Sequence, residues 1–284
     1  MTGLIDSSAL DAFVALVGER PWTERLAAIR AWSTGGTRAG RALLQYHAVE
    51  LAIERLRARQ NRPPSPAELR LAALAGDAAS LAGQLTRRGK ERLRKTLRAA
   101  LDANGTLVPA FHLLRTASLQ RSRGFAVRFA GFDDGAPFDL LIARGGIEAE
   151  VACDIVSAEA GRDVHRGAWF RLADQIDTDL QTWLAAHPGR YVLKMTLPLG
   201  LRGGLRQDRA EDNALAALHE RIRAMLAEQR RADQDEALVL RLDPLLLAAA
   251  QADELGLLPS LRREFGPEAH LSVTAAGQGV FVMA

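Results

Sequence analysis

The chain has 284 residues, of which 48% are hydrophobic and 25% are charged, and its formal net charge at neutral pH is only +3. This composition is typical of a folded globular protein with room for one large domain or two modest ones. The small net charge excludes a globally basic nucleic-acid binder, and the single cysteine, Cys153, excludes an intramolecular disulfide and a cysteine-rich zinc site.

The sequence shows no targeting or membrane segment. Its first residues lack a basic stretch followed by a long apolar run, and no apolar stretch elsewhere reaches the length of a transmembrane helix. We therefore expect a cytoplasmic location and no membrane partner.

Residues 1–103 carry only helical patterns. Apolar residues recur at helical spacing over 8–17, 22–32 and 37–60. After the linker at 61–64, a new helix begins at Ser65, because Ser65, Pro66 and Glu68 have the arrangement of a capping box. We expect this helical pattern to continue to about residue 103, with a break near Gly76, so the sequence predicts an all-helical region over 1–103.

The densest basic cluster lies within this region, from Arg87 to Lys95. On a helix, Leu93, Leu97 and Leu101 share one face, and the basic side chains at Arg87, Arg94 and Arg98 lie away from it. These three arginines are candidates for contacting nucleic-acid phosphates, and the competing interpretation is a solvated helix face. No aromatic residue is interleaved, so the run does not predict stacking of single-stranded bases.

The pattern changes from helix to strand after residue 106. A helix over 107–121 precedes strands over 125–129, 138–142 and 147–155, the last two joined by a turn at Gly145-Gly146. In the third strand the side chains alternate, so Glu148 and Glu150 face away from the apolar residues. Asp139 comes from the second strand, and pairing across the turn lets its carboxylate approach that of Glu148 or Glu150.

The remaining residues alternate between strands and helices. The sequence predicts helices over 168–186, 213–231, 245–251 and 258–265, and strands over 191–197, 237–242, 270–274 and 279–283.

The residues Pro137-Phe138-Asp139, the short turn and the segment Glu148-Ala149-Glu150 resemble the PD-(D/E)XK nuclease-like superfamily. The resemblance implies an α/β protein in which the helical region is followed, over 104–284, by a mixed-sheet restriction-endonuclease-like core. It also implies that Asp139 and Glu148 bind Mg²⁺ or Mn²⁺ and that Asp139, Glu148 and Glu150 form the catalytic group.

The chain departs from that family pattern at two points. Glu150 stands where the superfamily usually has a lysine, and the helix before the first strand carries no carboxylate. Lys194, in the middle of a predicted strand, is a candidate to replace the missing lysine in space, and the competing interpretation is an exposed strand lysine. Arg162 and Arg166 are further candidates for binding phosphate, or else they balance the charge of the carboxylates.

Two functions are therefore left open. The first is a divalent-metal-dependent nuclease, in which the metal activates a water molecule for hydrolysis of a phosphodiester. The second is a catalytically inactive nuclease-like module that binds nucleic acid or a protein partner, with a homo-oligomer as one form of that partner.

Overall fold

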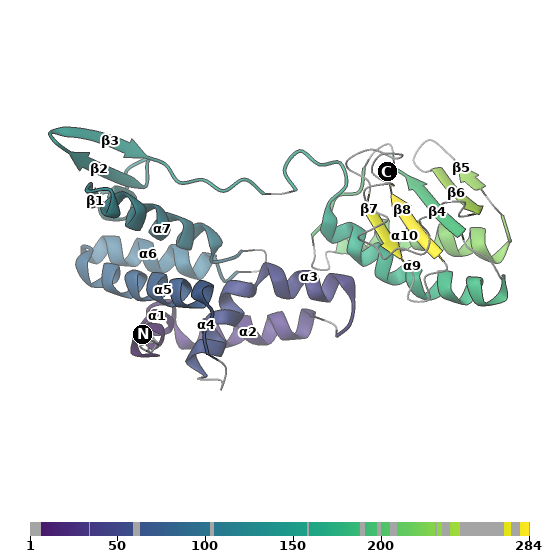
Figure 1. Cartoon of the computed structure of the whole chain (residues 1–284), viewed down its shortest axis with the longest axis horizontal. Coiled ribbons are helices and arrows are strands. Elements are labelled where there is room, and N and C mark those ends of the chain that lie inside the picture. The colour runs from purple at the N-terminus through teal and green to yellow at the C-terminus, as the bar shows by residue number, and fades with distance from the viewer. Residues whose placement is uncertain are drawn as a thin grey trace. The chain divides into compact units, whose positions relative to one another are not determined.

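A computed structural model of the chain describes residues 7–33, 35–58, 63–102, 105–157, 159–187, 191–197, 200–204, 209–230, 232–234, 239–244, 270–273 and 279–283. The chain is a mixed α/β protein, as the sequence predicts, and it divides into two compact units (Figure 1). Unit 1 comprises Met1–Ser33 and Leu43–Ser157, and unit 2 comprises Thr34–Ala42 and Ala158–Ala284.

Helices make up most of unit 1. They are α1 (Ser7–Val17), α2 (Glu19–Trp32), α4 (Ala48–Arg57), α5 (Pro66–Gln84), α6 (Arg87–Ala99), α7 (Val108–Ser122) and the short α8 (Ala130–Asp133). The described part of residues 1–103 contains no strand. The capping box at the start of α5 is confirmed, since Ser65 Oγ accepts from the Glu68 N–H and a Glu68 carboxylate oxygen accepts from the Ser65 N–H.

Two helix boundaries differ from the prediction. The single helix expected over 37–60 is split at His47 into α3 (Arg38–Tyr46) and α4; His47 is buried and contacts the guanidinium of Arg25 at 3.3 Å. The break expected near Gly76 is absent, because α5 continues through this residue. A Cβ at Gly76 would lie 3.4 Å from the Cβ of Ala9, so the glycine sits where α1 and α5 pack closely.

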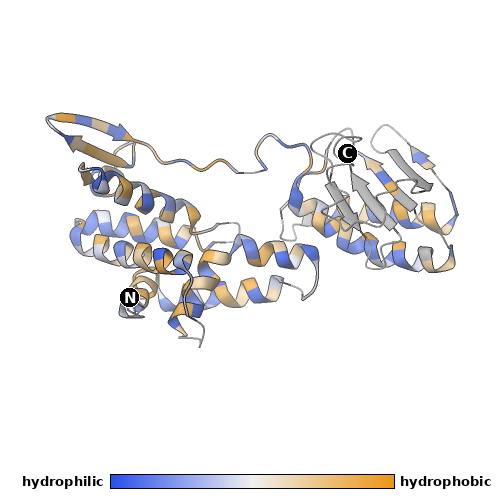
Figure 2. Ribbon diagram, in the orientation of Figure 1, coloured by the Kyte–Doolittle hydropathy of each residue, from blue (hydrophilic) through white to orange (hydrophobic). Residues whose placement is uncertain are grey.

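The core of unit 1 lies between α1, α5, α6 and α7, whose apolar faces are visible in Figure 2. Phe13 packs edge-on against Trp22 and Phe111, with ring centroids 6.2 and 5.6 Å apart. Leu93 and Leu97 of α6 are buried in the same core, as the helical periodicity predicts. The basic residues of α6 are therefore kept on its other faces.

A three-stranded antiparallel sheet, ordered β1-β2-β3, packs on these helices. Its strands are β1 (Ala126–Arg128), β2 (Leu140–Arg144) and β3 (Ile147–Val151). The predicted hairpin is confirmed: Gly145 and Gly146 have φ values of 59° and 79°, the positive pair that a type I′ turn requires. β3 ends at Val151 rather than at Ile155.

Unit 2 contains a five-stranded sheet ordered β5-β6-β4-β8-β7. Its elements are α9 (Arg166–Ala186), β4 (Tyr191–Thr196), α10 (Arg209–Ala227), β5 (Ala232–Gln234), β6 (Val239–Pro244), β7 (His270–Val273) and β8 (Gly279–Met283). Trp169 and Ile176 of α9 share a core with Leu193 of β4 and Ile222 of α10. The carboxylate of Asp174 in α9 accepts from the backbone N–H groups of Arg38 and Ala39, the first residues of α3.

The prediction of one mixed sheet from residue 104 onward is not what the structure shows. Leu140 and Ile142 of β2 are buried among the helices of unit 1, whereas Leu193 and Met195 of β4 are buried against α9 in unit 2. The strands therefore form two sheets, β1–β3 in unit 1 and the other five strands in unit 2. The helical segments expected at 245–251 and 258–265 lie outside the described residues.

Of the helices in the described ranges, none has both the length and the apolar composition that crossing a bilayer requires.

Candidate functional site

Asp139 lies at the base of the β2–β3 hairpin, just before β2 begins. Its backbone N–H donates to the Val151 carbonyl at 3.0 Å, and its Oδ2 accepts from the Cys153 N–H at 2.6 Å. The carboxylate thus continues the strand pairing beyond the last residue of β3, and it is half-buried as a result. Asp139 has a structural role in the hairpin as well as a position on a pocket.

Glu148 and Glu150 lie nearer the turn of the same hairpin. Glu148 pairs with Ala143, four positions along β2 from Asp139, and Glu150 pairs with Leu141, two positions away. At about 3.3 Å per residue, the offset between Asp139 and Glu148 is about 13 Å. Both glutamates are exposed. The structure therefore places Asp139 and Glu148 at opposite ends of the hairpin, with Glu150 between them.

These positions do not fit a divalent metal held jointly by Asp139 and Glu148. A Mg²⁺–oxygen bond is about 2.1 Å long, so two carboxylates that share the ion must approach within a few ångströms of each other. No group of three or more His, Cys, Asp or Glu side chains in the described residues is arranged to hold a metal ion.

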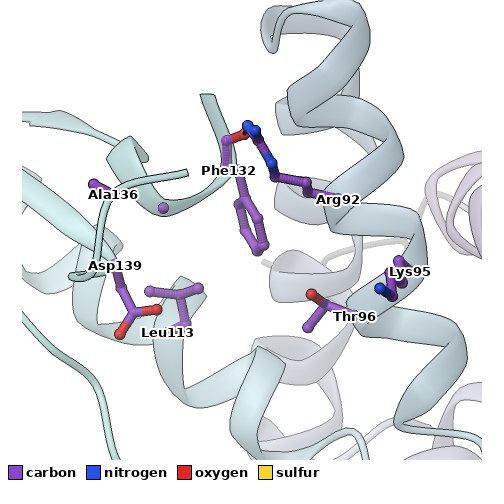
Figure 3. A pocket seen from close by; sticks show the side chains of 8 residues that line it. Arg92, Lys95, Thr96, Leu113, Phe132, Ala136 and Asp139 are labelled. Carbon is purple, nitrogen blue, oxygen red and sulfur yellow. Dashed lines mark hydrogen bonds between the residues drawn. The ribbon is translucent and has the colours of Figure 1, made fainter. Parts of the chain in front are cut away.

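Asp139 instead lines a pocket in unit 1, with a volume of about 300 Å³ (Figure 3). The pocket is formed by α6, α7, α8 and the segment leading into β2. Its lining residues are Arg92, Lys95, Thr96, Leu113, Gly131, Phe132, Ala136 and Asp139. Figure 3 shows Asp139 on the side opposite Lys95 and Thr96, with the ring of Phe132 projecting between the two sides.

Three hydrogen bonds hold helix α8 on α6 and its N-cap residue Thr86. Arg92 Nη1 donates to the carbonyls of Phe132 and Asp133 at 2.7 and 3.0 Å, and Asp133 Oδ1 accepts from the Thr86 N–H at 3.1 Å. Gly89 makes this approach possible, because a Cβ there would lie only 2.8 Å from Asp133 Oδ1. These contacts fix the backbone of Phe132 beside the pocket.

The basic residues of α6 fall into two sets. The first set donates to backbone carbonyls: Arg92 to α8, Arg94 Nε to Leu16 at 3.2 Å, and Arg98 Nε to Val17 at 2.9 Å. Arg94 and Arg98 therefore bind the last carbonyls of α1, which have no partner within that helix. The second set is exposed, and its side chains have no hydrogen bond or ion pair within the described residues: Arg87, Arg88, Lys90 and Lys95.

Arg162 and Arg166, the other predicted phosphate contacts, belong to unit 2. The backbone N–H of Arg166 donates to Glu159 Oε2 at 2.8 Å at the start of α9, and the N–H of Arg162 donates to the Glu159 carbonyl. Lys194 stands in β4 between β6 and β8, so its strand is not a neighbour of β3, contrary to the expectation.

Cys153 lies beside Asp139 at the base of the hairpin. Burial raises the pKa of its thiol, a hydrogen bond with Thr116 opposes this, and the negative charge of Asp139 raises the pKa further. The thiol is therefore protonated at neutral pH, as expected for a partly buried structural cysteine rather than a nucleophile.

Sequence reasoning missed the pocket itself. Lys95 lay within the basic run, but Thr96 and Phe132 carry no motif, and Phe132 reaches α6 only through the tertiary contacts of α8. Comparison with known proteins adds no further guide: no protein-family model, curated protein or solved structure matches the chain.

Proposed function

We propose that unit 1 is a nucleic-acid-binding module and that the exposed cations of α6 contact the phosphate backbone. The observation that carries the proposal is the composition and exposure of α6: seven of its 13 residues are basic and one is acidic. Four of the seven have exposed side chains without a hydrogen bond or ion pair among the described residues, and α6 also forms one wall of the pocket. Clustered cations of this kind neutralise phosphates and release their counterions.

The resemblance to the PD-(D/E)XK superfamily remains a proposal about the core of this module. It is supported by the order of α7, β1, β2 and β3 and by the position of Asp139 before β2. The environment of the glutamates favours binding over hydrolysis, since Glu150 replaces the expected lysine and Glu148 lies far from Asp139 along the hairpin.

A divalent-metal-dependent nuclease is the second candidate. One observation favours it: Asp139 lines the same pocket as Lys95, so a carboxylate and a lysine ammonium face one cavity. A binding module does not cleave nucleic acid, so a test for metal-dependent cleavage distinguishes the two candidates.

The first experiment removes the free cations of α6. In the variant Arg87→Gln/Arg88→Gln/Lys90→Gln, three exposed positive charges are lost and the buried leucines of the helix are unchanged. If each charge contacts one phosphate of a single strand, affinity at 0.1 M salt falls about 100-fold, because each contact contributes a slope of about −0.7. Fluorescence anisotropy with a labelled oligonucleotide measures the change.

The matched control removes three exposed arginines from other helices of unit 1, as Arg20→Gln/Arg30→Gln/Arg70→Gln. This variant has the same net charge as the first. Equal losses of affinity in the two variants would mean that only the net charge of the protein matters, which would contradict a role for α6. An unchanged affinity in both variants would also contradict the proposal.

The second experiment tests hydrolysis. We expect binding to persist in EDTA and no cleavage of RNA or DNA with Mg²⁺ or Mn²⁺ at millimolar concentration. Metal-dependent cleavage that disappears in Asp139→Asn, with a metal-induced rise in melting temperature lost in the same variant, would replace the binding-module proposal with the nuclease. Glu148→Gln and Glu150→Gln then report whether either glutamate takes part.

A further inference from the structure

We propose that the pocket on α6 binds one unpaired nucleotide of a single strand. This inference rests on the proposed function and specifies its ligand. Three different groups line the cavity: a cation, an aromatic ring and a carboxylate, at Lys95, Phe132 and Asp139 (Figure 3). A nucleotide presents the complementary groups, which are a phosphate, a planar base and hydroxyl or amino donors.

Lys95 and Thr96 form the anion side of the pocket. Neither side chain has a hydrogen bond or ion pair in the part of the chain that the structure describes, so the ammonium and the hydroxyl are both available as donors. Arg92 adds positive charge next to them, although its Nη1 is fixed on the carbonyls of α8. A phosphate bound here lies next to Lys95, one of the four exposed cations of α6.

Phe132 supplies the stacking surface. Its ring projects into the pocket, and it is stacked with Phe129 at a centroid separation of 6.1 Å and an interplanar angle of 14°. Because Arg92 holds the Phe132 carbonyl, the backbone that carries the ring is fixed beside the cavity. Stacking of one base on an aromatic side chain contributes about five- to 150-fold in affinity and tolerates any base.

Asp139 supplies the acceptor on the opposite side. Its Oδ2 is occupied by the Cys153 N–H, whereas Oδ1 has no hydrogen-bond partner among the described residues. A carboxylate accepts from a ribose hydroxyl or from an amino group of a base and repels a phosphate. The charges therefore orient the nucleotide, with its phosphate toward α6 and its donors toward the hairpin.

The size of the cavity limits the ligand to one nucleotide unit. About 300 Å³ is at the lower end of the range for small-molecule sites, roughly 300–1,000 Å³. A base within a duplex is paired and stacked on both faces, so it has no free face to place on Phe132. The pocket therefore favours a single strand over a duplex.

The test uses the full chain and three probes of one sequence: a labelled ten-nucleotide RNA, the matching DNA strand and the DNA duplex. We expect single strands to bind more tightly than the duplex. Phe132→Leu keeps an apolar side chain and removes the ring, so it is expected to weaken single-strand binding about five- to 150-fold and to leave duplex binding unchanged. Phe125→Leu, an aromatic residue of unit 1 outside the pocket, is the matched control.

Asp139→Asn distinguishes the two sources of the donor. If the donor is a ribose hydroxyl, the variant reduces the preference for RNA over DNA; if it is a base amino group, both single strands weaken equally. Unchanged binding of both strands would contradict the role of Asp139.

A mononucleotide separates this inference from the proposed function. Calorimetry is expected to show AMP binding to the wild-type chain and to the triple α6 variant Arg87→Gln/Arg88→Gln/Lys90→Gln. The same measurement is expected to show no AMP binding to Phe132→Leu. Suppose that oligonucleotide binding depends on the α6 cations but not on Phe132, and that AMP does not bind. This result would overturn the proposal of a nucleotide pocket, and the proposed nucleic-acid-binding function of unit 1 would stand. No binding of any oligonucleotide would overturn the proposed function itself.

Discussion

The two ends of the β2–β3 hairpin have different environments, although they carry the same kinds of residue. At the turn, Ile147 is 74% exposed and its neighbour Glu148 is exposed as well. At the base, Leu140 is completely buried and Asp139 is hydrogen-bonded to the opposite strand. The hairpin packs on the helices at its base and middle, through Leu140 and Ile142, and its turn is exposed. Alternation along a strand therefore defines which face a side chain lies on. Whether that side chain is exposed or held by contacts depends on how closely that part of the strand packs on the helices.

The largest expected difference between the two ends concerns apolar truncation. Leu140→Ala is expected to lower the free energy of unfolding of unit 1 by about 2–5 kcal/mol, because it opens a cavity in the core. Ile147→Ala at the turn is expected to change it by less than about 0.5 kcal/mol. Urea denaturation, with hydrogen exchange of hairpin peptides to localise the effect, measures both. Equal losses would mean that the turn is also packed.

The acidic residues give the next largest difference. Asp139→Ala leaves the Cys153 N–H without its acceptor and is expected to cost about 1–3 kcal/mol, whereas Glu148→Ala is expected to stay within about 0.5 kcal/mol of the wild type. The same urea titration checks both variants, with Asp139→Asn as an intermediate case because the amide oxygen still accepts. A neutral Asp139→Ala would show that the hydrogen bond contributes nothing to the fold.

The smallest expected effect concerns the Cys153 thiol. Its raised pKa leaves less thiolate than an ordinary cysteine has, so alkylation by iodoacetamide at pH 8 is expected to be slow and to accelerate as the pH rises. Asp139→Asn removes a nearby negative charge, which lowers the thiol pKa and speeds alkylation by less than about tenfold. Glu148→Gln, at the turn, is expected to leave the rate unchanged. Cys153 is the only cysteine, so mass spectrometry reports the site directly.

Local features of the fold were predictable from the sequence. The capping box at Ser65 and the Gly145-Gly146 turn depend on neighbouring residues, and both are present in the structure. The break at His47 was not predictable in this way, because it coincides with the contact to Arg25 from another helix. Partner choice among strands also depends on distant residues, so the sequence did not reveal that β3 and β4 belong to different sheets.

In the candidate site, too, the features that depend on neighbouring residues were predictable and those that depend on distant residues were not. Asp139 was found from its motif, and the basic residues of α6 from their density in the sequence. The pocket was missed because it brings Thr96 and Phe132 together across 36 positions, through hydrogen bonds that no local pattern encodes. The separation of Asp139 from Glu148 was missed although the predicted Gly145-Gly146 turn fixes the register, in which Glu148 pairs with Ala143.

The arginines that bind carbonyls have a consequence for ionic strength. Arg92, Arg94 and Arg98 each donate a hydrogen bond to a backbone carbonyl of α8 or α1, so these side chains link α6 to its neighbouring helices. Four free cations remain on α6, and for a single strand they predict a slope of log affinity against log salt near −3, whereas all seven would give about −5. A module with the shallower slope keeps more of its affinity as the salt concentration rises.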